Sequence, residues 1–291
     1  MDVRALLMGL AFAAMWASAF TSARIIVASA PPLTALSLRF LVSGLIGVLI
    51  ALALGQSWRL TRAQWRATII FGICQNALYL GLNFVAMQTI EASLAAIIAS
   101  TMPLLVGLAS WALLGERIGL LGGLGLVAGV IGVAVIMGSR LQGGADLYGL
   151  ALCVGGVLAL TLATLTVRGA TSGGNFLMIV GLQMLVGSLV LGVAGLSIET
   201  IRIDWSWQLV AAFLYTTLIP GLAATLVWFK LVNRIGAIKA ATFHFLNPFF
   251  GVVIAALILS ESLGVWDMVG VVVVMIGILA VQLSRQKQAS G

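Results

Sequence analysis

Charged residues are scarce in this chain. They make up 8% of its 291 residues, against 62% hydrophobic residues and a mean hydropathy of +1.20. A soluble domain carries about 25% charged residues. The apolar runs, such as Leu41–Leu54 and Val269–Val281, are continuous rather than alternating, which is typical of helices rather than strands. The composition excludes a soluble globular domain and indicates a polytopic helical membrane protein.

Cysteine and histidine are also rare. Cys74 and Cys153 both lie in apolar runs, so the sequence predicts no disulfide framework and no metal site. His244 is the only histidine. Because the pattern contains no nucleophile–base pair and no cofactor motif, we expect a protein that is not an enzyme and that binds no cofactor.

Carboxylates are missing from the expected membrane interior. All eight acidic residues fall near helix ends or in loops: Asp2, Glu91, Glu116, Asp146, Glu199, Asp204, Glu261 and Asp267. A proton-coupled exporter of cationic drugs usually needs a carboxylate near the bilayer centre, so that function is disfavoured. Glu116 and Glu261 close helices at matching positions, and each is expected to cap the helix that follows it.

The chain matches itself at a spacing of 145 residues, the interval from Pro103 to Pro248. The register holds without a gap through Leu114 with Leu259, Glu116 with Glu261, Gly119 with Gly264, Gly125 with Gly270, and Gly132 with Gly277. A register held this long indicates one structural unit used twice. In an apolar chain, a duplicated half is typical of secondary transporters.

Ten stretches are long enough to cross the bilayer, which takes about 20 helical residues. They are expected near 4–24, 34–54, 66–87, 92–114, 118–138, 147–167, 175–196, 206–229, 238–259 and 263–283. We therefore predict two five-helix repeats, 1–140 and 147–285. The first stretch imitates a signal peptide, but it corresponds to the sixth stretch of the repeat, so we predict a retained membrane helix.

Basic residues fall mostly on one side of these helices. With a cytoplasmic N-terminus, eleven of the fifteen lie in cytoplasmic segments, Arg24, Arg140 and Arg202 lie outside, and Arg39 lies within a helix. The positive-inside rule then places both termini in the cytoplasm. Because each repeat has an odd number of helices, the second is inverted, which favours alternating access. Topology accounts for the net charge of +7, so no nucleic-acid partner is expected.

The third helix carries a polar stripe formed by Gln75, Asn76, Tyr79 and Asn83. These spacings place the four side chains on one face. Uncompensated amides are costly in hydrocarbon, so the stripe is expected to line a solvated cavity. Hydrogen bonding between helices is the open alternative.

Pro220 and Gly221 stand at the positions in the second repeat that match Gln75 and Asn76. Proline removes a backbone donor and glycine loosens a helix, so a hinge is predicted in the eighth helix. Interrupted helices at corresponding positions of two halves point to a transport site, although here only one of the two is expected to be broken. Tyr215, which flanks this hinge, is a further candidate.

The ninth helix places His244 and Asn247 on one face just before Pro248, and the fourth offers Ser100 before Pro103. Both prolines are predicted hinges. His244 is either a buried neutral side chain or a substrate donor or titrating group. The sequence does not decide between these interpretations.

The roles of two further side chains within helices remain open. Trp16 in the first helix is either a packing residue or a cavity wall. Arg39, about two turns into the second helix, either extends outward or pairs with a carbonyl, or it anchors an anionic group.

The segment from Ala92 to Arg117, which contains Pro103, recurs from Ala237 to Glu261, which contains Pro248. The paired segment resembles the signature of the drug/metabolite transporter superfamily, in its bacterial ten-helix branch with two EamA-type domains. Arg39 after Pro31-Pro32 is similar to the second helix of that family. The resemblance implies a ten-helix inverted-repeat fold with a central cavity, and export of amino acids or related metabolites.

The sequence thus predicts an all-α polytopic membrane protein with ten transmembrane helices in two inverted five-helix repeats, located in the bacterial inner membrane. It is expected to be a secondary transporter that exports neutral or aromatic amino acids and related metabolites. Its expected partners are this small-molecule substrate and the lipid bilayer, and the protein itself is expected to be a monomer or weak dimer. The predicted substrate-binding residues are Trp16, Gln75, Asn76, Tyr79, Asn83, Ser100, Tyr215, His244 and Asn247. A drug or nucleotide-sugar carrier is the alternative, and a channel or membrane enzyme is less favoured.

Overall fold

The computed structural model describes residues 3–166 and 173–290, and this part of the chain is helical without strands. Ten helical stretches in it are long and apolar enough to cross a membrane. They are Val3–Val27, Pro32–Ala53, Arg62–Ala86, Ala92–Leu114, Leu120–Gln142, Leu147–Thr166, Phe176–Ile198, Trp207–Ile235, Lys239–Leu259 and Val265–Gln288. The ten-helix prediction is therefore confirmed. The expected end of the sixth helix at residue 167, and the cytoplasmic placement of Arg168, lie outside the described residues.

Six of these stretches are continuous α-helices. They are α1 (Val3–Val27), α2 (Pro32–Ala53), α7 (Leu120–Gln142), α8 (Leu147–Thr166), α9 (Phe176–Ile198) and α14 (Val265–Ser290). The other four stretches are divided. Their segments are α3 (Arg62–Phe71), η1 (Gly72–Tyr79) and α4 (Leu80–Ala86); α5 (Ala92–Ser100) and α6 (Met102–Leu114); α10 (Trp207–Leu218), η2 (Ile219–Ala223) and α11 (Ala224–Ile235); and α12 (Ala237–Ala241), η3 (Thr242–Leu246) and α13 (Asn247–Leu259).

The described chain forms two compact units, and each takes helices from both sequence repeats. The first unit contains the residues up to Thr21, Thr89–Leu150, and the residues from Ala223 onward. The second unit contains Ser22–Gln88 and Ala151–Leu222. The predicted repeats, 1–140 and 147–285, divide the sequence rather than these units, and their boundaries stay a prediction.

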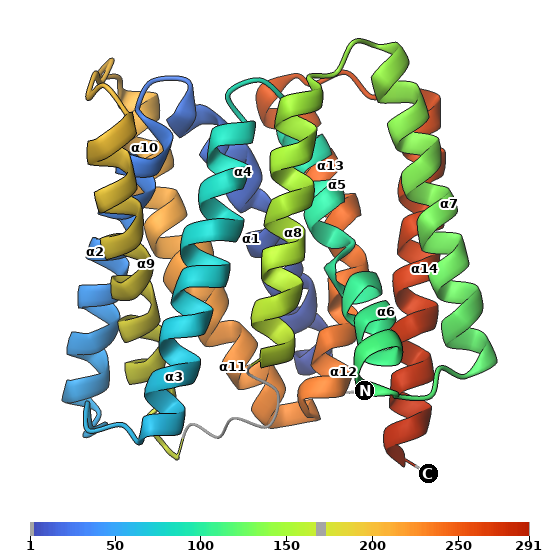
Figure 1. The fold of residues 1–291 in the computed structure, drawn as a ribbon, viewed down its shortest axis with the longest axis horizontal. Coiled ribbons are helices and arrows are strands. Elements are labelled where there is room, and N and C mark those ends of the chain that lie inside the picture. The colour runs from blue at the N-terminus through green and yellow to red at the C-terminus, as the bar shows by residue number, and fades with distance from the viewer. Residues whose placement is uncertain (1–2, 167–172, 291) are drawn as a thin grey trace. The chain divides into compact units, whose positions relative to one another are not determined.

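In the first unit, α7 and α14 run side by side (Figure 1) and touch through glycine backbones. A Cβ atom added to Gly125 would lie 2.7 Å from the carbonyl oxygen of Gly277, and one added to Gly132 would lie 2.9 Å from that of Gly270. The repeat matches Gly125 with Gly270 and Gly132 with Gly277. The contact of Gly125 with Gly277 is therefore the repeat equivalent of the contact of Gly270 with Gly132. This equivalence requires antiparallel helices, as an inverted repeat does.

In the second unit, the corresponding pair is α2 and α9, which also lie side by side (Figure 1). A Cβ atom at Gly181 would lie 3.0 Å from the carbonyl oxygen of Gly44. Two reciprocal hydrogen bonds reinforce this approach, because the hydroxyls of Ser37 and Ser188 each donate to the other residue's carbonyl at 2.8 Å. Small and hydroxylated residues are the usual means of close helix packing in membranes.

Carboxylates cap the starts of two helices. The Glu199 side chain accepts from the amides of Leu33 and Thr34 at 2.7 and 2.9 Å, at the start of α2. The Glu261 side chain accepts from the amides of Ala92 and Ser93 at 2.7 and 3.0 Å, at the start of α5. Both pairs of contacts satisfy amides that a helix leaves unpaired at its N-terminus.

The expectation that Glu261 caps the helix after it is wrong. The chain leaves α13 through Ser260 in the left-handed conformation, with φ of 57°, and Glu261 then bonds to α5. At the start of α14 the hydrogen bond comes instead from Asp267, whose carboxylate accepts from the Gly264 amide at 3.0 Å. Gly115, the repeat counterpart of Ser260, has the same left-handed conformation with φ of 67°.

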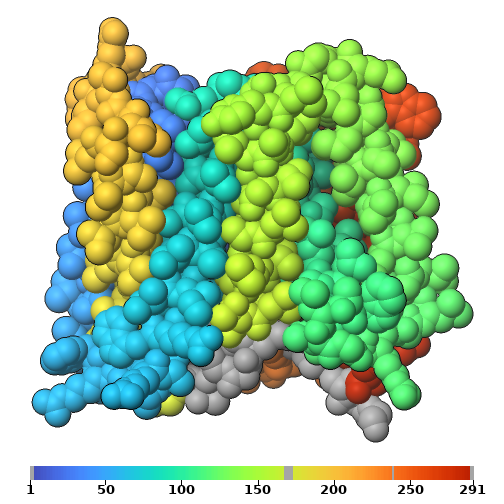
Figure 2. Space-filling model, viewed as in Figure 1, coloured from blue at the N-terminus to red at the C-terminus, as the bar shows by residue number. Residues whose placement is uncertain are grey.

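Exposed side chains along the helices are largely apolar. On α7, drawn in green in Figure 2, the exposed large side chains are Leu120, Leu121, Leu124, Val127, Val130, Ile131 and Leu141. Exposure of a continuous apolar surface of this kind to water is unfavourable, and the surface suits contact with lipid chains.

Candidate functional site

Interruptions occur in both the third and the eighth helix. The predicted break at Pro220 and Gly221 forms the π-helical segment η2. The third helix was expected to be unbroken, but its segment η1, Gly72–Tyr79, is also π-helical, so that expectation is wrong. The two segments fall at corresponding places of the repeats, which is the pattern that marks transport sites. Local π-turns are also frequent at functional sites.

A close approach accompanies the π-helical segment of the third helix. A Cβ atom at Gly72 would lie 2.7 Å from the carbonyl oxygen of Gln183, and one at Gly187 would lie 2.4 Å from Cβ of Asn76. Glycine at both positions lets α9 lie directly against η1. The irregular turn therefore depends on packing that the local sequence of the third helix does not reveal.

The fourth and ninth helices are interrupted just before their prolines. Pro103 and Pro248 each lie in the first turn of a new helix, α6 and α13. Proline is tolerated there because a helix leaves its first amides unpaired. In the ninth helix the 3-10 segment η3 precedes the proline and carries His244. These positions suit the predicted hinge role.

An aromatic cluster in the first unit surrounds His244. Its ring centroid lies 5.4 Å from that of Phe12, 5.4 Å from that of Trp16 and 5.3 Å from that of Trp228. The first two rings meet the imidazole edge to face, an arrangement that aromatic quadrupoles favour. Trp16, Trp228 and His244 keep part of their surface accessible. We call Phe12, Trp16, Trp228 and His244 the aromatic cluster.

Asn247 joins the aromatic cluster through its side chain. Its Nδ2 lies 2.9 Å from Nδ1 of His244, a hydrogen bond that the amide donates when the ring carries its proton on Nε2. Its Oδ1 is buried and has no hydrogen-bond partner among the described residues. A buried acceptor without a donor is costly, and a solute bearing an N–H group would supply that donor.

The polar stripe of the third helix is held largely by hydrogen bonds within the second unit. The Asn76 amide donates to the carbonyl of Gln183 at 2.9 Å. The Asn83 amide donates to the carbonyl of Tyr79 at 2.7 Å, and its Oδ1 lies 3.4 Å from Sγ of Cys153. The contacts of Asn76 with Gln183 and of Asn83 with Cys153 match the alternative of bonding between helices, whereas the Asn83 amide bonds within its own helix.

The other two members of the stripe differ from the asparagines. The Tyr79 side chain is buried, and its hydroxyl has no hydrogen-bond partner within the described part of the chain. Gln75 is only partly buried. The Tyr79 hydroxyl is thus not committed to a hydrogen bond among the described residues, and the roles of Tyr79 and Gln75 in binding stay predictions.

Ser100 and Tyr215 are the remaining predicted substrate residues. The Ser100 hydroxyl donates to the carbonyl of Ala96, one turn earlier in its own helix, at 2.6 Å. Tyr215 is 39% exposed on α10. Their part in substrate binding stays a prediction.

Phe12 and Trp228 are the members of the aromatic cluster that the sequence pattern missed. Phe12 stands one helical turn before Trp16, and this spacing places both on one face. Trp228 lacks such a signal, because a tryptophan in an apolar helix is equally compatible with lipid contact. Tertiary packing alone brings it to His244.

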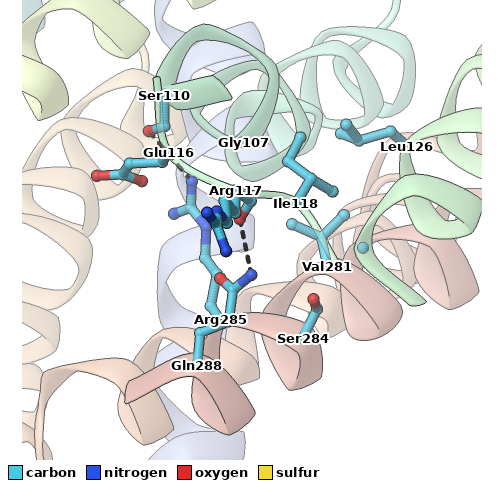
Figure 3. A pocket seen from close by; sticks show the side chains of 11 residues that line it. Gly107, Ser110, Glu116, Arg117, Ile118, Leu126, Val281, Ser284, Arg285 and Gln288 are labelled. Atoms are coloured by element: carbon cyan, nitrogen blue, oxygen red, sulfur yellow. Dashed lines mark hydrogen bonds between the residues drawn. The ribbon is translucent and has the colours of Figure 1, made fainter. Parts of the chain in front are cut away.

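A small cavity lies between α6, α7 and α14 in the first unit (Figure 3). Arg285 reaches the hydroxyl of Ser110 at 3.5 Å, and the Gln288 amide donates to the carbonyl of Arg117 at 2.7 Å. The space open to the centre of a water molecule is about 20 Å³, which suits one or two ordered waters rather than an organic solute. None of the predicted substrate residues lines this cavity.

Two charged groups fix the loop that leads into α8 and the end of α7. The carboxylate of Asp146 accepts from the hydroxyl of Thr89 at 2.7 Å and from the amide of Gly149 at 2.9 Å. These hydrogen bonds lower the pKa of Asp146, with the Thr89 contact as the largest cause. Arg140 pairs with Glu91 and, at 3.0 Å, with Asp267. No group of three or more metal-binding side chains occurs in the described part of the chain.

The sequence pattern of the EamA-like transporter family matches residues 3–138 and again residues 147–283. Together the two matches cover most of the chain, so the protein belongs to this family of the drug/metabolite transporter superfamily. The doubled match agrees with the internal repeat, and it makes the protein a membrane transporter.

Individual relatives agree with this assignment. The chain is 27% identical over 275 residues to the uncharacterized transporter YvbV of Bacillus subtilis, covering 94% of this chain and 90% of YvbV. It is 25% identical over 270 residues to protein PecM of Dickeya dadantii, covering 88% and 86% of the two chains. A solved crystal structure shares the fold at a TM-score of 0.70 with 18% identity, covering 99% of this chain and 100% of the other.

Proposed function

We propose that this transporter exports neutral or aromatic amino acids and related small metabolites across the bacterial inner membrane by alternating access. The observation that carries the proposal is the aromatic cluster with the unpaired Oδ1 of Asn247 beside it. Aromatic faces suit an apolar or aromatic solute side chain. The Asn247 acceptor suits the ammonium group of the same solute.

The inverted repeat supports alternating access. The antiparallel pairs α7 with α14 and α2 with α9 are each formed by equivalent helices of the two repeats, so one fold can take two related forms of similar energy. The interrupted third, fourth, eighth and ninth helices lie at matching positions in the two repeats. Irregular segments of this kind are where a helix can change direction with little loss of hydrogen bonds.

Transport by purified protein in proteoliposomes tests the proposed substrate class. We expect saturable exchange of L-phenylalanine and L-leucine. Trp16→Ala should raise the half-saturating phenylalanine concentration about 2- to 10-fold, the equivalent of one aromatic pair. Trp58→Ala is the matched control, because Trp58 is exposed near a helix end, and it should leave transport unchanged.

Several outcomes would contradict this function. Saturable exchange of a nucleotide sugar or a cationic drug in place of the amino acids would favour the alternative carriers. Unitary conductance in planar bilayers would indicate a channel. Equal effects of the substitutions at Trp16 and Trp58 would remove the aromatic cluster from the binding site.

The proposed orientation places both termini in the cytoplasm, on the strength of the uneven distribution of Lys and Arg. Single cysteines at Ser57 and Gly143, both exposed positions, should react with impermeant reagents from opposite sides of the membrane once Cys74 and Cys153 are replaced. Labelling of both from one side would overturn the orientation. In line with this placement we propose that the protein acts as a monomer or weak dimer in the lipid bilayer, without a nucleic-acid partner.

A further inference from the structure

Arg39 is a charged side chain buried inside the second unit. It lies in the middle third of α2, and the residue is 6% exposed. Its Nε has no hydrogen-bond partner among the described residues, and none of the ion pairs in that part of the chain includes it. A buried charge without a partner is among the costliest features a membrane protein can carry.

Neither structural explanation that the sequence left open accounts for the Nε of Arg39. An outward-reaching guanidinium would leave the protein interior, yet Nη2 lies 3.5 Å from the place that a Cβ atom of Gly221 would take. Gly221 belongs to η2, midway along the eighth helix. The alternative of pairing with a carbonyl does not account for the buried Nε, which has no hydrogen-bond partner among the described residues.

The second unit also offers no resident counterion. Its only acidic residues are Glu199 and Asp204, and both lie outside the membrane-spanning stretches. The Glu199 carboxylate is engaged by the amides at the start of α2, and Asp204 lies 3.9 Å from Arg202. The positive charge of Arg39 therefore has no fixed negative partner within its own unit.

The surroundings of Arg39 resemble a prepared anion site. The Phe40 ring lies 5.1 Å from the guanidinium carbon and screens one side of the charge. The unpaired Nε and the neighbouring Nη2 form one edge of the planar group, which is the edge that grips a carboxylate through two parallel hydrogen bonds. Because residue 221 is a glycine, it places no side chain beside Nη2.

We propose that Arg39 binds the carboxylate group of the transported solute. This inference rests on the proposed function only for its choice of solute, an α-amino acid. It is argued from contacts within the second unit alone, and it adds the chemical group that the solute must carry. Binding of the carboxylate supplies the counterion that the second unit lacks. Without the solute, the charge of Arg39 has no counterion in that unit. Arg39 is thereby a specificity-determining residue that separates amino acids from uncharged analogues.

Paired substrates test this role directly. L-Phenylalanine and L-phenylalaninamide differ in the carboxylate, and their transport is compared in proteoliposomes of the wild type, Arg39→Gln and Arg39→Lys. We expect Arg39→Gln to lower phenylalanine transport about 10- to 100-fold, the usual effect of losing hydrogen bonds to a charged group, while amide transport changes less than about twofold. Arg39→Lys keeps the charge without the planar fork and should fall between the two.

The matched control is Arg202→Gln, the same chemical change at a residue whose side chain is 86% exposed, and it should leave both fluxes unchanged. An equal fall of phenylalanine and phenylalaninamide transport in Arg39→Gln would overturn the inference, because it would show a general role in folding or movement. Unchanged phenylalanine transport in that variant would overturn it as well, while leaving the proposed function intact.

A binding measurement separates this inference from the proposed function. Thermal stabilisation of the purified protein is measured with benzoate and with benzamide. Preferential stabilisation by benzoate in the wild type, and its reduction in Arg39→Lys, support an anion site even if no amino acid is transported. Equal stabilisation by the two probes would overturn the site, and this comparison does not depend on whether Arg39→Gln folds.

Discussion

The closely packed helix pairs of the two units, α7 with α14 and α2 with α9, pack by different means. In the first unit, α7 and α14 meet through glycine backbones, as at Gly132 and Gly270. In the second unit, α2 and α9 combine a close approach at Gly181 with reciprocal hydrogen bonds between Ser37 and Ser188. The same repeat relation generates both pairs. The first pair therefore combines glycine contacts with the ion pair of Arg140 and Asp267, whereas the second combines a glycine contact with hydrogen bonds between hydroxyls and carbonyls.

The end caps extend this comparison. Glu261 in the first unit accepts from two amides of α5, while Glu199 in the second unit accepts from two amides of α2 and, at 2.8 Å, from the hydroxyl of Thr34. The second unit again adds a hydroxyl to a contact that the first unit makes with the backbone only. The cap of the second unit thus has one hydrogen bond more than that of the first.

The largest effect is expected at the glycine contact of the first unit. Gly132→Leu should destabilise the protein by about 3 kcal/mol or more, since even a Cβ atom would lie 2.8 Å from the backbone nitrogen of Val274. Gly138→Leu on the same helix is the control, because nothing lies within 4 Å of its Cβ position. Unfolding in denaturing detergent measures both, and equal stability of the two variants would refute the packing argument.

A smaller effect is expected at the two caps. Glu199→Gln and Glu261→Gln should each cost about 1–2 kcal/mol, because one carboxylate oxygen becomes an amide that cannot accept from a backbone N–H. The loss should be greater for Glu199, which accepts three hydrogen bonds against two for Glu261. The same unfolding measurement ranks the two variants, and the reverse order would contradict the comparison.

A modest effect is expected from the serine contact of the second unit. Ser188→Ala should cost about 0.6 kcal/mol, the average for hydrogen bonds between membrane helices. A double-mutant cycle with Ser37→Ala isolates the coupling between the two hydroxyls. Fully additive losses would show that the reciprocal bonds do not stabilise the α2–α9 pair as a unit.

The smallest effect concerns Asp146 and pH. Because its pKa is lowered in the folded protein, its charged form contributes stability at neutral pH, and this contribution is lost as pH falls through the lowered folded value. Thr89→Val removes the main cause and should raise the pKa of Asp146 toward its ordinary range. The pH dependence of unfolding, with Asp146→Asn as the reference, measures the shift, and an unchanged acid limb in Thr89→Val would contradict it.

The sequence predicted much of the fold. Ten apolar stretches and the 145-residue register were sufficient to expect ten helices and an inverted repeat, because spanning length and charge asymmetry depend on local composition. The helix breaks at Pro103, Pro220 and Pro248 were likewise predictable from residue type. The π-helical segment η1 was not, since it arises where α9 lies against Gly72 and Gly187.

Prediction of the candidate site was less complete. His244 and Asn247 do come together, because residues at helical spacing share a face. Trp16 and Trp228 meet His244 only through packing between different helices, which helical spacing does not reveal. Asn76 and Asn83 carry the polar pattern of a cavity lining, yet their amides bond to carbonyls of the second unit.

The sequence by itself determined that this chain crosses the membrane ten times in two inverted copies, because hydropathy, repeat register and charge distribution are properties read along the chain. Only the tertiary structure decided which polar groups are satisfied. Asn76 finds the carbonyl of Gln183, whereas Arg39 finds no counterion among the described residues of its unit. The cause is physical: the cost of a buried polar group depends on the partners that packing brings within reach, and those partners come from distant parts of the sequence.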